Sequence, residues 1–199
     1  MPADTSEENF VASKKRLNHL EILQIALIII FAYLMNQWKG PALAILVFLM
    51  WIDKNYFTRL KFEGEFGVEL ETLTSVLAGL IYGPFFGFVF GFLFWTFLGG
   101  FFEIIAWAIS PPYAPNTFPF VPSIETLVGG LLGALAGFVG ATIPLVLLIT
   151  IASIIRNLII FMKDQIIGWP PRLAYFSNVL FNIIIVLAFQ PYLDSLLKL

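Results

Sequence analysis

Cysteine is absent from this sequence of 199 residues, and histidine occurs once, at His19. Without cysteine the chain has no disulfide bond, no thiolate metal site and no thiol nucleophile, and a single histidine offers no ligand cluster for a metal. Charged residues make up only 12%, the formal net charge is −2, and no strongly basic block occurs, which argues against a nucleic-acid surface. We therefore expect no metal, no cofactor and no nucleic-acid partner.

Common enzyme motifs are also missing. The sequence contains no Gly-x-Ser-x-Gly, His-Glu-x-x-His or Gly-x-x-x-x-Gly-Lys pattern. These patterns are typical of serine hydrolases, zinc proteases and phosphate-loop ATPases. We therefore predict a protein that is not an enzyme.

Apolar residues dominate the composition. They make up 59% of the chain and the mean hydropathy is +0.90, whereas a soluble domain is about 45–50% apolar. A transmembrane helix needs about 20 largely apolar residues to cross a hydrocarbon core of about 30 Å. The apolar runs are continuous rather than alternating, which favours helices over barrel strands. The sequence therefore predicts an all-α, polytopic transmembrane helix bundle of six or seven helices.

The first 18 residues differ from the rest of the chain. They are polar and contain Lys14, Lys15 and Arg16 ahead of an apolar run that lacks a small-residue cleavage site. This pattern predicts a cytoplasmic tail over residues 1–18 rather than a signal peptide. Residues 19–199 are expected to form a single transmembrane domain.

Apolar runs and proline positions predict where the helices lie. We expect helices over about residues 20–37, 41 to 51 or 56, 67–83, 85–109 and 173–189. A charged loop is expected at 53–65, an irregular proline-rich loop at 110–122 and an interfacial segment at 191–199. A helix over 123–163 would be about 60 Å long, twice the hydrocarbon thickness. A break is therefore predicted between Gly137 and Pro144, which gives seven helices. One bent helix with a re-entrant half would give six.

Basic residues are distributed unevenly over the predicted loops. Seven crossings would place most of them on one side of the membrane, namely Lys14, Lys15, Arg16, Lys54, Arg59, Lys61, Lys163 and Arg172. Only Lys39 and Lys198 would lie clearly on the other side. Because cytoplasmic loops are rich in lysine and arginine, we predict a multi-pass protein of the cell membrane with a cytoplasmic N-terminus.

Glycine recurs every four residues in two stripes, at Gly79, Gly83, Gly87 and Gly91 and at Gly129, Gly133 and Gly137. Such spacing leaves one helix face without side chains, so another backbone can approach closely. The stripes would serve packing inside the chain or docking against another membrane subunit. Gly79 and Gly83 follow a Glu-Thr-Leu leader at residues 71–73, and Gly133 and Gly137 follow the same leader at residues 125–127 with identical offsets. This repeat predicts two helices that run in the same direction.

Polar residues within the apolar runs are the candidates for function, because an ionisable group at the bilayer centre costs about 2.5 kcal/mol or more. We predict a substrate-binding site formed by Trp95, Glu103, Arg156, Asn157, Asn178 and Asn182. Glu103 is expected either to pair with a cation such as Arg156 or to be protonated. Asn178 and Asn182 share a helix face, where they would bind a ligand or fasten helices together.

Glu71 and Glu125 are also acidic residues in or near apolar runs. Each is predicted in the first turn of its helix, where the helix dipole stabilises a carboxylate without any substrate. Arg156 is expected either to lie inside the bundle as the partner of a glutamate or an anion, or to extend its charge toward the membrane surface.

Residues 77–93, LAGLIYGPFFGFVFGFL, resemble the substrate-binding S components of energy-coupling factor (ECF) vitamin transporters. In that family a short helix ends in a similar Leu-x-Gly-x-x-Tyr/Phe-Gly-Pro turn before a glycine-spaced helix. Residues 123–136 and 178–191 resemble the family's next glycine-rich helix and its final helix. The resemblance implies a subunit that captures a vitamin or similar small molecule, and that works with a transmembrane coupling protein and ATPases.

A second hypothesis is a non-catalytic structural or assembly subunit of a larger membrane complex. A related morphogenesis protein family of the cell-wall elongation machinery has comparable helices, and resemblance to it would imply a scaffold rather than a carrier. In that case the glycine stripes would contact partner chains and the polar residues would only fasten helices. The capture hypothesis predicts a ligand site near the polar residues, and the structural hypothesis predicts a dry core.

Overall fold

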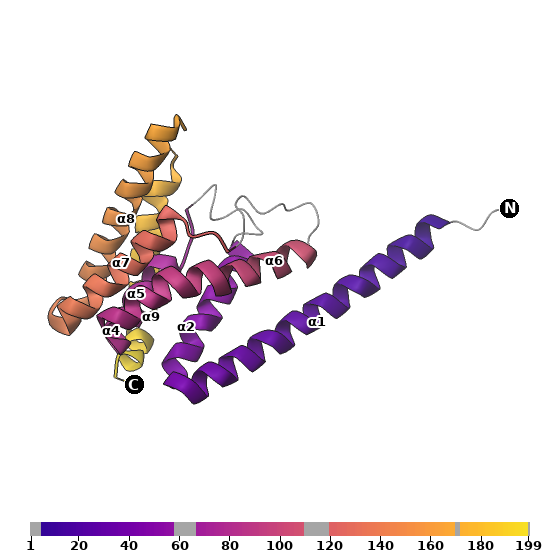
Figure 1. The fold of residues 1–199 in the computed structure, drawn as a ribbon, viewed down its shortest axis with the longest axis horizontal. Coiled ribbons are helices and arrows are strands. Elements are labelled where there is room, and N and C mark those ends of the chain that lie inside the picture. Colours follow the sequence, from indigo (N-terminus) through magenta and orange to yellow (C-terminus); the bar gives the residue numbers. More distant parts are fainter. Residues whose placement is uncertain (1–4, 58–66, 110–119, 170–171, 199) are drawn as a thin grey trace.

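The computed structural model describes residues 5–57, 67–109, 120–169 and 172–198, with the backbone alone described for residues 5–21 and 107–109. Over this part of the chain the structure is helical and contains no strand. The elements, in order, are α1 (Thr5–Lys39), α2 (Pro41–Ile52), η1 (Asp53–Phe57), α4 (Glu71–Tyr82), α5 (Pro84–Val89), η2 (Phe90–Gly99), α6 (Gly100–Ile109), α7 (Ile124–Val139), η3 (Gly140–Thr142), α8 (Leu145–Ile167) and α9 (Ala174–Leu196) (Figure 1). The all-α prediction is confirmed.

Five of the described helices are long and apolar enough to cross a membrane. They cover Ile22–Lys39, Pro84–Ala106, Ile124–Thr142, Leu145–Ile167 and Ala174–Leu196. Their outer faces present large apolar side chains such as Phe138 and Leu180, which lipid solvates and water does not. The chain is therefore a multi-pass membrane protein.

Helix α4 is the centre of the bundle. Its 12 residues span about 18 Å, too little to cross the hydrocarbon core. Residues 71–79 are all buried, because α2, α5, η2, α7 and α8 surround the helix. A helix enclosed by other helices need not be apolar on every face, since its polar groups can find partners in the protein. This position allows Glu71, Thr72, Thr74 and Ser75 to lie inside a membrane protein.

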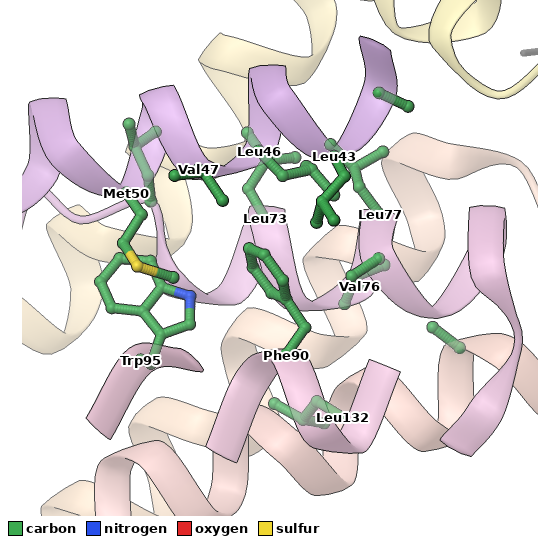
Figure 2. Packing of buried hydrophobic residues seen from close by; sticks show 14 of the residues in the cluster. Leu43, Leu46, Val47, Met50, Leu73, Val76, Leu77, Phe90, Trp95 and Leu132 are labelled. Carbon is green, nitrogen blue, oxygen red and sulfur yellow. The ribbon is translucent and has the colours of Figure 1, made fainter. Parts of the chain in front are cut away.

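The apolar core lies beside this central helix. In Figure 2, Leu43 and Leu46 of α2 lie opposite Leu73 of α4. Phe90 of η2 and Leu132 of α7 extend the same cluster from the other side. The chain turns back after α4 at Gly83, which has φ +88°, and Pro84 begins the next helix. The left-handed backbone at Gly83 explains why glycine occupies this turn.

The predicted break in the segment 123–163 is confirmed. Helix α7 ends at Val139, a short 3-10 turn follows, and α8 begins at Leu145 after Pro144. The helix predicted over 85–109 is also present, but its middle part is wound as a π-helix over Phe90–Gly99. Nothing in the periodicity predicted this winding, which is uncommon and often occurs at functional positions.

Three predicted boundaries were wrong. The first helix begins at Thr5 rather than near residue 20, so the expected tail is helical from that point. The third helix begins at Glu71 rather than near Gly67, because Gly67 has a left-handed backbone and Asp53 binds the amide of Leu70.

The last helix was expected to end near residue 189, but α9 continues through Pro191 to Leu196. A proline removes one amide donor, and such a loss is tolerated within membrane helices where other groups compensate. Most of the proline-rich loop, residues 110–119, lies outside the described residues.

Candidate functional site

A chain of asparagines joins α8, α9 and the segment before α4. Asn157 Nδ2 donates to Asn178 Oδ1 at 2.7 Å, and Asn178 Nδ2 donates to the carbonyl oxygen of Gly67 at 2.7 Å. Asn182 Nδ2 donates to the backbone oxygen of Asn178 at 3.0 Å. All three side chains are buried. Asn178 and Asn182 therefore share an inward face of α9, as their spacing predicts.

Arg156 of α8 connects this chain to two carboxylates. Its Nη2 donates to Glu71 Oε2 at 2.8 Å, and its Nη1 forms an ion pair with Glu69 Oε1. Thr72 Oγ1 donates to the same Glu69 oxygen at 3.2 Å. The arginine is 3% exposed. It is therefore the interior partner of two glutamates, and the alternative of an arginine that reaches the membrane surface was wrong.

The network extends to η1 and η2 through Asp53 and Trp95. Asp53 Oδ1 accepts a hydrogen bond of 2.6 Å from the amide of Leu70. Lys54 Nζ lies 5.3 Å from the centroid of the Trp95 ring, within cation–π range. Trp95 Nε1 donates to Thr74 Oγ1 at 3.2 Å. Trp95 is thus held against α4, one turn from Glu71.

A second set of charges lies near the end of α8. Lys163 pairs with Glu125 of α7, and its Nζ is 3.3 Å from Asp164 Oδ1. The hydroxyl of Tyr175 in α9 donates to Asp164 Oδ2. Lys163 and Glu125 are partly exposed, so solvent weakens their pairing. These residues tie α7, α8 and α9 together at one end of the bundle.

The structure brings together four of the six predicted binding residues, namely Arg156, Asn157, Asn178 and Asn182. Trp95 joins them through α4. Glu103 does not, because it lies on α6, whose main contacts are with α1, η1 and η2. The carboxylates that bind the Arg156 guanidinium are those of Glu69 and Glu71.

Sequence reasoning missed the polar residues that follow α2. Asp53 and Asn55 were assigned to a charged loop, but both are buried, and they lie on the π-helical turn that continues α2. Gly67 was also missed, although its carbonyl oxygen binds Asn178 and its backbone lies against Ala174. The available signal was that Asp53 directly follows the apolar run 41–52 without a turn residue between them.

Some buried polar atoms lack a hydrogen-bond partner among the described residues, and two of them lie on the α8–α9 helix pair. They are Ser153 Oγ on α8 and Asn182 Oδ1 on α9, and both side chains are fully enclosed. An unsatisfied buried polar atom costs about 1–3 kcal/mol. The α8–α9 interface therefore contains buried polar atoms whose hydrogen-bonding capacity is not satisfied.

These two residues lie near the middle of the membrane spans. The pairs Asp164–Tyr175 and Asn157–Asn178 indicate that α8 and α9 are antiparallel, so Ser153 and Asn182 each lie one turn further along from the Asn157–Asn178 pair. Each is three residues from the midpoint of its 23-residue helix. Sites for solutes and ions in membrane transporters are commonly found at this depth.

The two glycine stripes lie against each other. A Cβ atom placed on Gly87 would be 2.5 Å from the carbonyl oxygen of Gly133, and one on Gly91 would be 2.6 Å from Gly129. Cβ atoms on Gly79 and Gly137 would likewise collide with Gly133 and Pro84. Only Gly83 has open space, because it forms the turn before α5. The stripes therefore pack inside the chain.

Helices α4 and α7 run in the same direction, as the repeated leader predicts. Near their N-terminal ends Glu71 lies close to Gly129, and further along Gly79 lies against Gly133. Gly79 and Gly133 are equivalent positions in the two repeats, since each is eight residues after its leader glutamate.

In the described ranges, no group of three or more histidine, cysteine, aspartate and glutamate residues is placed to hold a metal ion. The network consists instead of amides, hydroxyls and one guanidinium shared by two carboxylates. Such groups can bind a small polar molecule by hydrogen bonds. Comparison with protein-family models, with curated proteins and with solved structures finds no match for this chain.

Proposed function

We propose that this protein is a membrane-embedded subunit that captures a small polar solute, such as a vitamin, for uptake. It would work with a transmembrane coupling protein and ATPases, as the resemblance of residues 77–93 implies. The observation that carries the proposal is the pair of enclosed, unpartnered polar atoms at Ser153 and Asn182, midway through α8 and α9.

Fastening of helices accounts for only part of the polar network. Arg156, Asn157 and Asn178 each bind a group on another element, so their role can be structural. Ser153 and the carbonyl of Asn182 bind nothing in the described residues. Alanine at position 153 and leucine at position 182 would join α8 to α9 without the cost of unsatisfied polar atoms. A bound solute would supply hydrogen-bond partners for these two groups.

Polar side chains also mark a path along α8 and α9, at intervals from one end of the bundle to its middle. Lys163 and Asp164 lie at the end, Asn157 and Asn178 follow, and Ser153 and Asn182 lie deepest. With the N-terminus in the cytoplasm, this end would face the ATPases. A solute bound at mid-depth could then be released along the path.

The glycine stripes favour capture over assembly. A structural subunit was expected to use them for docking, but Gly79, Gly87, Gly91, Gly129, Gly133 and Gly137 already meet atoms of the chain's own helices. No side-chain-free face of these helices is left for a partner at those positions.

The exposed apolar face of helix α1 favours the second candidate, a structural or assembly subunit. The helix lies at the edge of the bundle, where it contacts α2 and α6 (Figure 1). Its described span is 11% buried, and it presents Ile22, Ile29 and Tyr33 outward. Lipid can cover this face, and so can a partner helix.

Native mass spectrometry of the purified protein distinguishes the two candidates. Capture predicts a small molecule retained at one copy per chain, and its loss in Asn182→Leu. Glu103→Gln is the matched control, because Glu103 lies on α6 and should leave retention unchanged. Stoichiometric protein partners with no retained molecule in the wild type would refute capture and support assembly.

A further inference from the structure

The hydrogen bonds of Asn182 fix which end of its amide remains available. Its Nδ2 donates to the backbone oxygen of Asn178 at 3.0 Å and lies 3.3 Å from Asn178 Oδ1. Both partner atoms are acceptors, so a flipped amide would set oxygen against oxygen. The atom without a partner is therefore the carbonyl oxygen, Oδ1.

The available oxygen of Asn182 sets the chemistry of whatever binds there. An amide oxygen accepts hydrogen bonds or coordinates a cation, but it cannot donate to an anion. Ser153 Oγ, on the facing helix, supplies a second oxygen that can do the same. Arg156, three residues from Ser153 on α8, binds the carboxylates of Glu69 and Glu71, so its positive charge is already paired with acidic oxygens.

We infer that the α8–α9 interface binds a compact, positively charged group through Ser153 Oγ and Asn182 Oδ1. The inference rests on the proposed function, because it names the class of solute that the same site takes. The group is the primary ammonium of an organic solute or an alkali metal ion, since both present positive charge to oxygen ligands in the same way. A carboxylate or phosphate group is excluded by the lone pairs of Asn182 Oδ1.

Thermal unfolding of the detergent-purified full chain, followed by tryptophan fluorescence, tests this inference. Sodium, potassium or methylammonium chloride replaces N-methylglucamine chloride at constant ionic strength and pH. We expect a saturable rise in melting temperature of about 5 °C or more at a hundredfold excess over the dissociation constant. Saturation by a metal ion identifies an ion site, and saturation by methylammonium alone identifies an ammonium site.

Ser153→Ala and Asn182→Leu should each weaken the apparent affinity for the cation at least tenfold. Thr150→Val is the matched control on the same helix, because its hydroxyl already donates to the carbonyl oxygen of Val146 at 2.7 Å. Ser153→Ala should fold normally in N-methylglucamine, since it removes an unsatisfied hydroxyl. If Asn182→Leu fails to fold, Ser153→Ala still decides the result.

The inference fails if no cation shifts the melting temperature of the wild type, or if the shift persists in Ser153→Ala. Its failure differs from that of the proposed function. A retained neutral or anionic solute would refute the cationic site while capture stands. A saturable sodium or potassium shift without any retained organic solute would support the ion site and refute solute capture.

Discussion

Helix α4 takes part in two interfaces that are equally buried but are held by different forces. Toward α5 and α7 it presents Gly79, and the backbones of the helices touch. Toward α8 it presents Glu71, which binds Arg156 at 2.8 Å. The glycine interface depends on shape alone, because it contains no side chain to adjust. The polar interface depends on charge and hydrogen bonding, so a compensating second substitution can repair it.

The largest expected effect tests the glycine interface. Gly79→Ala should abolish the folded, monodisperse protein, because the new Cβ would collide with the carbonyl oxygen of Gly133. Gly99→Ala is the matched control, since its Cβ would come no closer than 3.7 Å to Trp95. Size-exclusion chromatography of fluorescently tagged variants measures both. Equal recovery of the two variants would show that the helices are not closely packed at Gly79.

The next largest effect tests the polar interface. Arg156→Met should lower the free energy of unfolding by about 3–5 kcal/mol, because it leaves buried carboxylates without their partner. Adding Glu69→Gln and Glu71→Gln should restore most of the loss, because neutral amides no longer need a cation. Melting temperatures in detergent measure the series. A triple variant as unstable as Arg156→Met alone would contradict the role of charge at this interface.

A smaller effect compares two tryptophans of the core. Trp95→Phe should cost about 1 kcal/mol beyond the change in packing, because it removes the hydrogen bond to Thr74. Trp51→Phe is the control, since Trp51 Nε1 has no hydrogen-bond partner among the described residues. Both variants are compared by thermal unfolding. A larger loss in Trp51→Phe would reverse the expected order.

The smallest effect concerns the end of the bundle. Lys163→Met should change stability by only about 0–1 kcal/mol, because Lys163 and Glu125 are partly exposed and solvent screens their attraction. Unfolding at low and high salt checks this, and any wild-type advantage should shrink as salt increases. A loss as large as that of Arg156→Met would mean that this pair is as protected as the buried one.

Much of the fold could be predicted from local sequence signals. The break before Pro144 and the turn at Gly83 follow from the backbone limits of proline and glycine. The start of α4 could not be predicted, because it depends on a hydrogen bond between Asp53 and the amide of Leu70, 17 residues apart. The continuation of α9 through Pro191 likewise depends on compensation within the helix bundle.

The candidate site was predicted as a set of residue types but not as a set of partners. Arg156, Asn157, Asn178 and Asn182 stand out because lipid does not tolerate them. Glu103 stands out for the same reason, but it lies on α6, whose main contacts are with α1, η1 and η2 rather than with α8 and α9. The depth and rotation of α4 relative to α8 decide which acidic residues bind Arg156. The sequence pattern of a single helix does not give its position relative to another helix.

The sequence by itself determined that this chain is a membrane protein, that it is helical, and which glycines and polar residues are candidates for contacts between helices. These properties follow from solvation and from the backbone preferences of single residues, which act locally. Only the tertiary structure decided that the two stripes meet each other, that Glu69 and Glu71 share Arg156, and that Asn157 of α8 binds Asn178 of α9. Those contacts join residues far apart in the chain, and they exist only once the helices have packed at a defined register.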